Sequence, residues 1–127
     1  MPATKTATIL CIDDEPTALS VRRLLLESAG YQVATAHSAE EGIRVFKSQP
    51  IDAVIMDYWL SGMDGIEAAH ELKRISPAIP IVVLSALTEL PGESIGAADR
   101  WFLKGEDPAY LLNAISTLLE ARASDPL

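Results

Sequence analysis

Short apolar runs alternate with helical patterns along this chain. Nearly continuous apolar runs occur near residues 8–12, 52–56, 80–84 and 100–103, and a weaker run occurs at Tyr31–Ala36. Such runs are typical of strands in a parallel sheet that is covered on both faces, because neither face then meets water. The connections between them are too long for hairpins. The pattern therefore predicts an α/β fold with a five-stranded, parallel, doubly wound sheet.

Between these runs, apolar residues recur at intervals of three and four, which predicts helices with one apolar face. The four stripes are Ala18, Val21 and Leu25; Ala39, Ile43 and Phe46; Ile66, Ala69 and Leu72; and Leu111, Ile115, Leu118 and Leu119. Gly30 is suited to end the first helix, since glycine readily adopts a positive φ. Asp107 is suited to cap the last helix, which Pro108 would begin.

The segment between the fourth and fifth strands departs from this pattern. Pro91 and Gly92 interrupt it, and they cost about 3 and 1 kcal/mol relative to Ala in a helix interior. We therefore expect loop at residues 88–92 and a shortened fourth helix that begins near Glu93 or Ser94. Only residues 94–99 have a helical pattern there.

Composition and charge narrow the classes of function. The chain has 127 residues, a single-domain length, and is 49% hydrophobic, which argues against disorder. No apolar run approaches the roughly 18–20 residues that cross a bilayer, and Met1–Ala7 lacks the apolar core of a signal peptide. We therefore expect a cytoplasmic protein with no membrane partner. The net charge of −8 disfavours direct nucleic-acid binding, because phosphate backbones recruit Lys and Arg. The single cysteine, Cys11, lies in a strand pattern and should be a buried thiol.

Four of the predicted strands end in residues suited to phosphoryl chemistry. Asp13 and Asp14 follow the first strand, Asp57 the third, Ser85 the fourth and Lys104 the fifth. Ligands bind outside the carboxyl ends of such strands, so these residues should meet at one edge. Neighbouring acids repel one another, and a divalent cation such as Mg²⁺ would compensate them. A carboxylate can also act as a nucleophile toward phosphorus.

Each of these residues also has an ordinary structural explanation when taken alone. Asp14 could cap the first helix while Asp13 is solvated. Asp57 could be an acid in a loop, Ser85 a plain loop serine, and Lys104 an exposed lysine. Their joint placement at strand ends favours the phosphoryl site over these separate explanations.

Other chemistries fit the sequence less well. There is no GxxxxGK[ST] loop, and acids rather than glycines follow the first strand. His37 and His70 are far apart and have no cysteine pair to complete a zinc site, so we expect both on the surface.

Five sequence motifs occur together with these features. They are Ile12-Asp13-Asp14-Glu15-Pro16, Met56-Asp57, Gly62-Met63-Asp64-Gly65-Ile66-Glu67, Leu84-Ser85-Ala86, and Gly96-Ala97-Ala98-Asp99 leading to Lys104. In this combination the chain resembles the receiver domain of bacterial two-component response regulators, from about Thr8 to Ala121. The resemblance implies strand order 2-1-3-4-5. It also implies one receiver domain over residues 1–127, with its core at about 8–121.

The resemblance further implies a role for each acid. Asp57 would accept a phosphoryl group from a histidine kinase or a phosphotransfer protein. Asp14 and Asp57 would bind Mg²⁺ or Mn²⁺ directly, together with the backbone carbonyl of Trp59. Asp13 would act through water.

By the same resemblance, Ser85 and Lys104 would hold the phosphoryl oxygens, and Trp101 stands where the family keeps a switch aromatic. Without metal, Lys104 should pair with Asp57. Gly105 replaces the usual Pro, so the customary cis bond is not expected. A downstream protein partner would read the switched surface, which makes the chain a signalling module rather than an enzyme.

Two rival functions use the same fold. The first is a pseudo-receiver, an interaction module that is not phosphorylated, and the complete set of site residues argues against it. The second is a phosphohydrolase that forms an aspartyl-phosphate. Such enzymes have a D-x-D arrangement after the first strand and a cap insertion, and Asp13-Asp14 does not match that arrangement.

Overall fold

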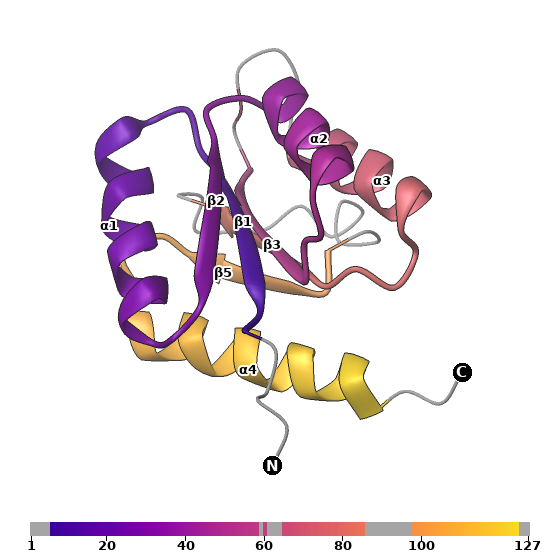
Figure 1. The fold of residues 1–127 in the computed structure, drawn as a ribbon. Coiled ribbons are helices and arrows are strands. Elements are labelled where there is room, and N and C mark those ends of the chain that lie inside the picture. Colours follow the sequence, from indigo (N-terminus) through magenta and orange to yellow (C-terminus); the bar gives the residue numbers. More distant parts are fainter. Residues whose placement is uncertain (1–5, 59, 61–64, 86–97, 125–127) are drawn as a thin grey trace.

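Figure 1 shows the computed structural model of the chain, which describes residues 6–58, 60, 65–85 and 98–124. Strands and helices alternate along these ranges. They are β1 (Thr8–Ile12), α1 (Pro16–Ser28), β2 (Gln32–Ala36), α2 (Ala39–Ser48), β3 (Ala53–Asp57), α3 (Gly65–Ile75), β4 (Ile81–Ser85), β5 (Arg100–Leu103) and α4 (Pro108–Ser124).

The five strands form one parallel sheet in the order β2-β1-β3-β4-β5. The predicted fold class and strand order are therefore confirmed. In the register of the sheet, Ile12 lies opposite Met56, and Met56 lies opposite Val83. The carboxyl ends of β1, β3 and β4 consequently reach the same edge, where the residues that follow them can meet.

Helices cover both faces of the sheet (Figure 1). Successive strand residues point to opposite faces, so each strand contributes to two cores. Against α1 and α4 lie the buried strand residues Ile9, Cys11, Ala53, Ile55, Val82 and Leu84. Against α2 and α3 lie Leu10, Ile12, Val54, Met56, Ile81 and Val83. Every residue of β3 and β4 is buried, which explains their continuous apolar sequence.

The apolar stripes predicted for α2, α3 and α4 pack against these cores. The stripe predicted for α1 does so only in part, through Leu25. Leu19, Arg22 and Leu26 are the buried residues of α1, whereas Val21 is 61% exposed. The true stripe is rotated from the predicted one by a single residue, or about 100° of helix. Both faces of α1 contain aliphatic residues. Because arginine is usually exposed, Arg22 indicated that the face it shares with Leu19 and Leu26 was the solvent face.

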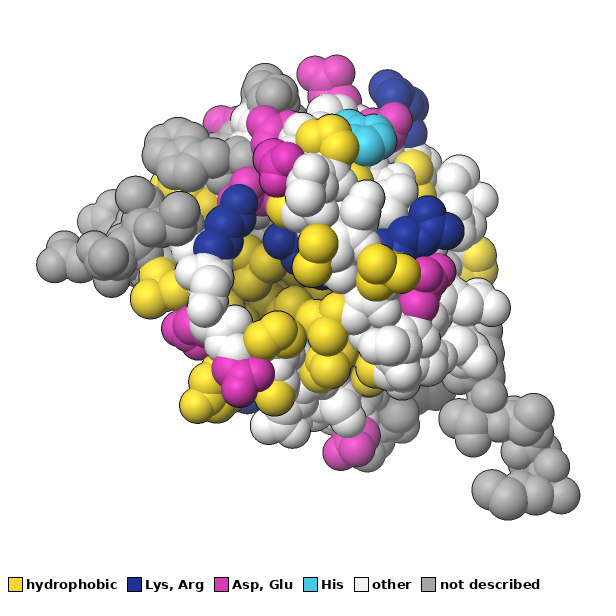
Figure 2. Space-filling model, turned by 90° about the vertical axis from the view of Figure 1, so that its left-hand side faces the viewer, with side chains coloured by type: hydrophobic (Ala, Val, Ile, Leu, Met, Phe, Trp, Pro, Cys, Tyr) yellow, Lys and Arg dark blue, Asp and Glu magenta, His cyan; other side chains and the backbone are white. Residues whose placement is uncertain are grey.

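An apolar hollow of about 370 Å³ lies between α1, β5 and α4 (Figure 2). Ala18, Val21 and Leu25, the residues predicted to face the sheet, line this hollow from α1. Phe102 and Leu111 line it from the other side. The apolar stripe predicted for α1 therefore forms one wall of this hollow.

The ends of the helices largely follow the sequence signals. Gly30 has a φ of 98° and its N–H donates to the Glu27 carbonyl, which ends α1 as predicted. The Asp107 carboxylate accepts a hydrogen bond from the Ala109 N–H at 2.9 Å, as a cap of α4 should. The cap of α1 is Glu15, whose carboxylate accepts from two backbone N–H groups, so the capping role considered for Asp14 is wrong.

The predicted loop at 88–92 and most of the shortened fourth helix, at 94–97, lie outside the described residues. Ala98 and Asp99 are described, and the prediction that they are helical is wrong. The Asp99 N–H donates to the Ile81 carbonyl at 2.8 Å, and its carboxylate accepts from the Ile81 N–H at 2.8 Å. These bonds already join Asp99 to the start of β4, which excludes a helical backbone there.

Three smaller expectations are also met. His37 and His70 are both exposed. Cys11 is fully buried in β1, and burial raises the pKa of its thiol to about 12. The peptide after Lys104 is not cis, and Gly105 has a φ of 92°.

Among the helices that the structure describes, none has the length and apolar character needed to cross a membrane.

Candidate metal and phosphoryl site

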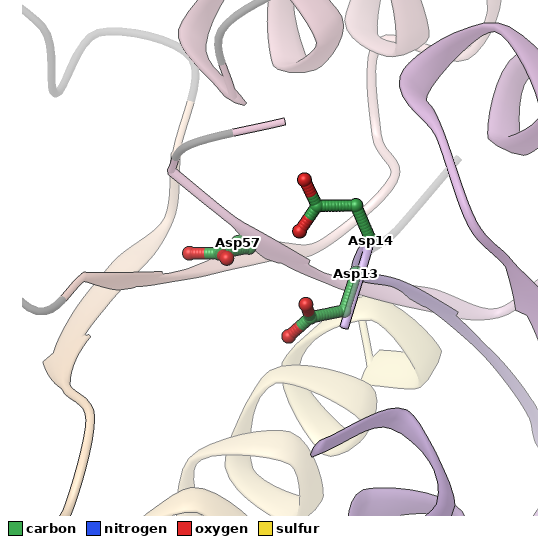
Figure 3. A group of neighbouring side chains, drawn as sticks. All are labelled: Asp13, Asp14 and Asp57. Carbon is green, nitrogen blue, oxygen red and sulfur yellow. The ribbon is translucent and has the colours of Figure 1, made fainter. Parts of the chain in front are cut away.

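Three carboxylates meet at the carboxyl edge of the sheet (Figure 3). Asp13 and Asp14 directly follow β1, and Asp57 is the last residue of β3. Each offers an oxygen that lies within 4.8 Å of the oxygens offered by the other two. Asp13 and Asp57 are buried, and Asp14 is exposed. The structure thus brings together the acids that the sequence placed at one edge.

Asp13 is held through its backbone N–H and both of its carboxylate oxygens. Its backbone N–H donates to the Ala36 carbonyl at 3.1 Å, which extends the pairing of β1 with β2. One carboxylate oxygen, Oδ1, accepts from the Glu15 N–H at 2.9 Å, and Oδ2 lies 3.2 Å from Nη1 of Arg22. Both oxygens of a fully buried acid are therefore occupied by donors.

Lys104 reaches into the cluster from the end of β5. Its ammonium donates to Oδ2 of Asp57 at 2.8 Å and lies 3.9 Å from Oδ2 of Asp13. The predicted pairing of Lys104 with Asp57 in the absence of metal is confirmed. The Lys104 N–H donates to the carbonyl of Ser85 at 2.8 Å, so the buried Ser85 stands beside the lysine at the same edge.

The start of α3 packs against the backbone of Asp57 and Tyr58. The Gly65 N–H donates to the Tyr58 carbonyl at 2.6 Å. A Cβ added at Gly65 would stand 2.7 Å from the carbonyl oxygen of Asp57 and 2.9 Å from Cα of Tyr58. Glycine is therefore required here for a close approach of two backbone segments.

Trp101 packs beside the site from β5. Its ring and that of Tyr58 have centroids 5.7 Å apart and are tilted by 48°. Its indole Nε1 is buried, and no residue in the described ranges accepts a hydrogen bond from it. A buried donor that is left unpaired costs about 1–3 kcal/mol, so an acceptor brought to this N–H would stabilise the indole that carries it.

The donor set fits a hard divalent cation. Mg²⁺ prefers carboxylate oxygens, water and phosphate oxygens over nitrogen or sulfur. Three carboxylates, one of them exposed, offer such oxygens, while Lys104 offers a cation for phosphate. The carbonyl of Trp59, which we also expect to bind the metal, lies outside the described residues.

Arg22 is the site residue that sequence reasoning missed. A signal was present, because Leu19, Arg22 and Leu26 share one helical face. An arginine on an apolar face indicates a buried acid nearby, and Asp13 is that acid.

Such a sheet edge, with clustered acids and a lysine on a doubly wound parallel sheet, defines an α/β protein suited to binding a cation and a phosphoryl group together. Comparison with models of known protein families shows to which family the chain belongs. A family model described as the response regulator receiver domain matches residues 9–116, and the chain belongs to this family.

Curated relatives agree with this assignment. Transcriptional regulatory protein GlrR of Escherichia coli (strain K12) is 34% identical over 123 residues, which cover 94% of this chain and 28% of GlrR. Transcriptional regulatory protein YvrH of Bacillus subtilis (strain 168) is 36% identical over 119 residues, which cover 90% of this chain and 49% of YvrH. The chain therefore spans less than half of either relative.

Solved structures of similar length have the same fold. A response regulator receiver domain protein from Clostridium thermocellum superposes with a TM-score of 0.85 at 31% identity, covering 92% of this chain and 97% of that one. Response regulator protein TrrA from Thermotoga maritima, solved in complex with Mg²⁺–BeF, has a TM-score of 0.84 at 30% identity, covering 89% and 99%.

Proposed function

We propose that this chain is a phospho-accepting receiver domain of a two-component system. Asp57 takes the phosphoryl group from a histidine kinase or a phosphotransfer protein. The supporting observation is the cluster of Asp13, Asp14 and Asp57 with Lys104 bonded to Asp57 at 2.8 Å. We further propose that residues 1–127 form one receiver domain, with its core at about 8–121, that works in the cytoplasm.

In this function Asp14, Asp57 and the carbonyl of Trp59 would hold Mg²⁺ or Mn²⁺ directly, and Asp13 would hold it through water. A bound cation supplies charge that offsets the negative phosphoryl oxygens and the acids around them. That the similar protein TrrA was solved with Mg²⁺–BeF supports the choice of Mg²⁺ as the cation.

The chemistry itself belongs to Asp57. One of its carboxylate oxygens forms a bond to phosphorus as the bond from phosphorus to the donor breaks, and the donor leaves with that electron pair. Lys104, now paired with Asp57, would move to a phosphoryl oxygen, and the Ser85 hydroxyl would donate to another. No external substrate is turned over, so the chain acts as a signalling module rather than an enzyme.

Phosphorylation would change the position of the Trp101 side chain. A second position in which the indole N–H finds an acceptor would gain a hydrogen bond, and phosphorylation would shift the population toward it. A shift of this kind changes the surface beside β5 and lets a downstream protein partner bind. With a net charge of −8, we propose no direct nucleic-acid contact by this chain.

Acetyl phosphate tests the proposal without a partner protein. In the presence of Mg²⁺ we expect one phosphoryl group per chain, and a chelator should prevent its incorporation. Intact-protein mass spectrometry measures the product. No incorporation would favour the pseudo-receiver, whereas turnover of an added phosphate ester would favour the phosphohydrolase.

The hollow between α1 and α4 is the surface we assign to the phosphodonor (Figure 2). Lys104 lines it and also contacts Asp57, so a protein seated there lies next to the acceptor. Its α1 wall is apolar and Val21 is largely exposed, which suits the apolar face of a helix that carries the donor histidine.

Val21→Asp should therefore slow transfer from a protein donor while sparing transfer from acetyl phosphate. Burying the new carboxylate under the donor is unfavourable, and we expect at least about a tenfold lower rate. The donor is any phosphorylated histidine phosphotransfer protein that labels the wild type. Ile75→Asp is the matched control, because Ile75 is an exposed β-branched residue on α3. Equal slowing in both variants would rule out this surface.

A further inference from the structure

Arg22 occupies a core position of α1 and is 9% exposed. Leu19 and Leu26 flank it on the buried face of the helix. A guanidinium loses much of its hydration there, and such groups are rarely buried without a partner. Its partner is Oδ2 of Asp13, at 3.2 Å from Nη1. The buried face of α1 is thus built to bring a fixed positive charge to the acid cluster.

The positive charge of Arg22 lowers the net negative charge of the acid cluster. Three carboxylates face two cations, Arg22 and Lys104, which leaves one formal negative charge. The side chains of these two cations differ in how far they are exposed and so in how easily they can move. The side chain of Lys104 is 34% exposed and can move away, whereas that of Arg22 is 10% exposed and sits beside a carboxylate with no exposure. Only the arginine is a permanent part of the cluster.

We propose that Arg22 is an internal counter-ion that weakens the binding of Mg²⁺ by Asp13, Asp14 and Asp57, and so sets the cation concentration at which this receiver becomes competent. The inference rests on the function proposed above. A divalent cation that enters the cluster is repelled by the guanidinium, and burial limits how far solvent can screen that repulsion. The same contact holds Asp13, both of whose oxygens already have donors, away from direct coordination.

A purely structural role makes a different prediction. If Arg22 served only to anchor α1, its replacement would lower stability and leave Mg²⁺ affinity unchanged or reduced, since a loosened site binds less well. A counter-ion predicts that neutral replacements bind Mg²⁺ more tightly and that a positive replacement restores the wild-type value. Affinity, rather than stability, therefore separates the two roles.

The experiment is a titration with Mg²⁺ alone, followed by tryptophan fluorescence and checked by calorimetry. Arg22→Met keeps the apolar stem and removes the charge, and we expect its Kd to fall about tenfold, the equivalent of about 1.4 kcal/mol. Arg22→Lys should stay near the wild type. Arg23→Met is the matched control, because Arg23 is the next residue of α1, is exposed, and pairs only with Glu27 among the described residues. Its affinity should change less than about twofold, as expected for a screened surface charge.

A second neutral variant is available if the first one does not fold. If Arg22→Met does not fold, Arg22→Gln carries the same expectation, because its amide can still donate to Asp13. Equal or weaker Mg²⁺ binding by a folded neutral variant, or an equal gain in Arg23→Met, would overturn the inference. Failure of the proposed function is a separate result: a wild type that binds Mg²⁺ but takes no phosphoryl group from acetyl phosphate.

Discussion

Asp57→Asn should abolish phosphorylation of the chain by acetyl phosphate. The amide has no carboxylate to attack phosphorus, and it also loses the charge that now pairs with Lys104 at 2.8 Å. Loss of a nucleophile typically lowers a rate by orders of magnitude, and we expect a fall of more than about 100-fold. The initial rate of phosphoryl incorporation, measured by mass spectrometry with Mg²⁺ present, provides the test.

Asp107→Asn provides the control for this experiment. It makes the same chemical change at an exposed residue outside the acid cluster, and Asn caps a helix about as well as Asp. Its phosphorylation rate should match that of the wild type. Label that persists in Asp57→Asn at the wild-type rate would show that another residue is the acceptor.

Gly65→Ala should lower the stability of the fold. The new Cβ would meet the Asp57 carbonyl oxygen at 2.7 Å and Tyr58 Cα at 2.9 Å, and both belong to backbone that cannot rotate away. Overpacking of this kind costs about 1–3 kcal/mol. We expect a lower midpoint of urea unfolding, together with slower phosphorylation because the acceptor segment must shift.

Gly42→Ala separates the close approach at Gly65 from a general effect of alanine. Gly42 also lies in a helix, but the nearest atoms to its added Cβ belong to the side chain of Ile12 rather than to backbone, and a side chain can adjust more readily. Alanine favours the helix by about 1 kcal/mol, which offsets that adjustment. The two substitutions should therefore differ clearly. Similar unfolding midpoints would show that the backbone contact at Gly65 relaxes easily.

Much of the fold could be predicted because strand ends carry local information. A strand buried on both faces is a continuous apolar run, and the polar residue that ends it is visible at once, as Asp57 is after Met56. The parallel sheet then brings Asp13, Asp57 and Lys104 to one edge. The strand order came from the family resemblance, since periodicity alone does not rank the strands.

Two of the wrong predictions share a physical cause: a contact with a residue far away in the sequence overrides the local pattern. Arg22 is buried because it pairs with Asp13, whereas an arginine without such a partner is expected at the surface. Asp99 is not helical because it exchanges two hydrogen bonds with Ile81 of β4. Glu15 caps α1 although Asp14 has the shorter, more usual capping side chain. At Arg22 and Asp99 a tertiary contact decided between two acceptable local choices, whereas the cap was a local choice between two neighbouring acids.

Cys11 makes the opening of this sheet measurable without an added label. Its thiol is fully buried, and a pKa of about 12 keeps it protonated, so an alkylating reagent has neither access nor a thiolate to attack. Alkylation must then proceed through molecules in which β1, which lies between β2 and β3, has come apart from its neighbours. When reclosing is faster than capture, the rate follows the fraction of open molecules. A ligand that binds only the folded chain lowers that fraction, so its affinity can be read from how far it slows the loss of one thiol.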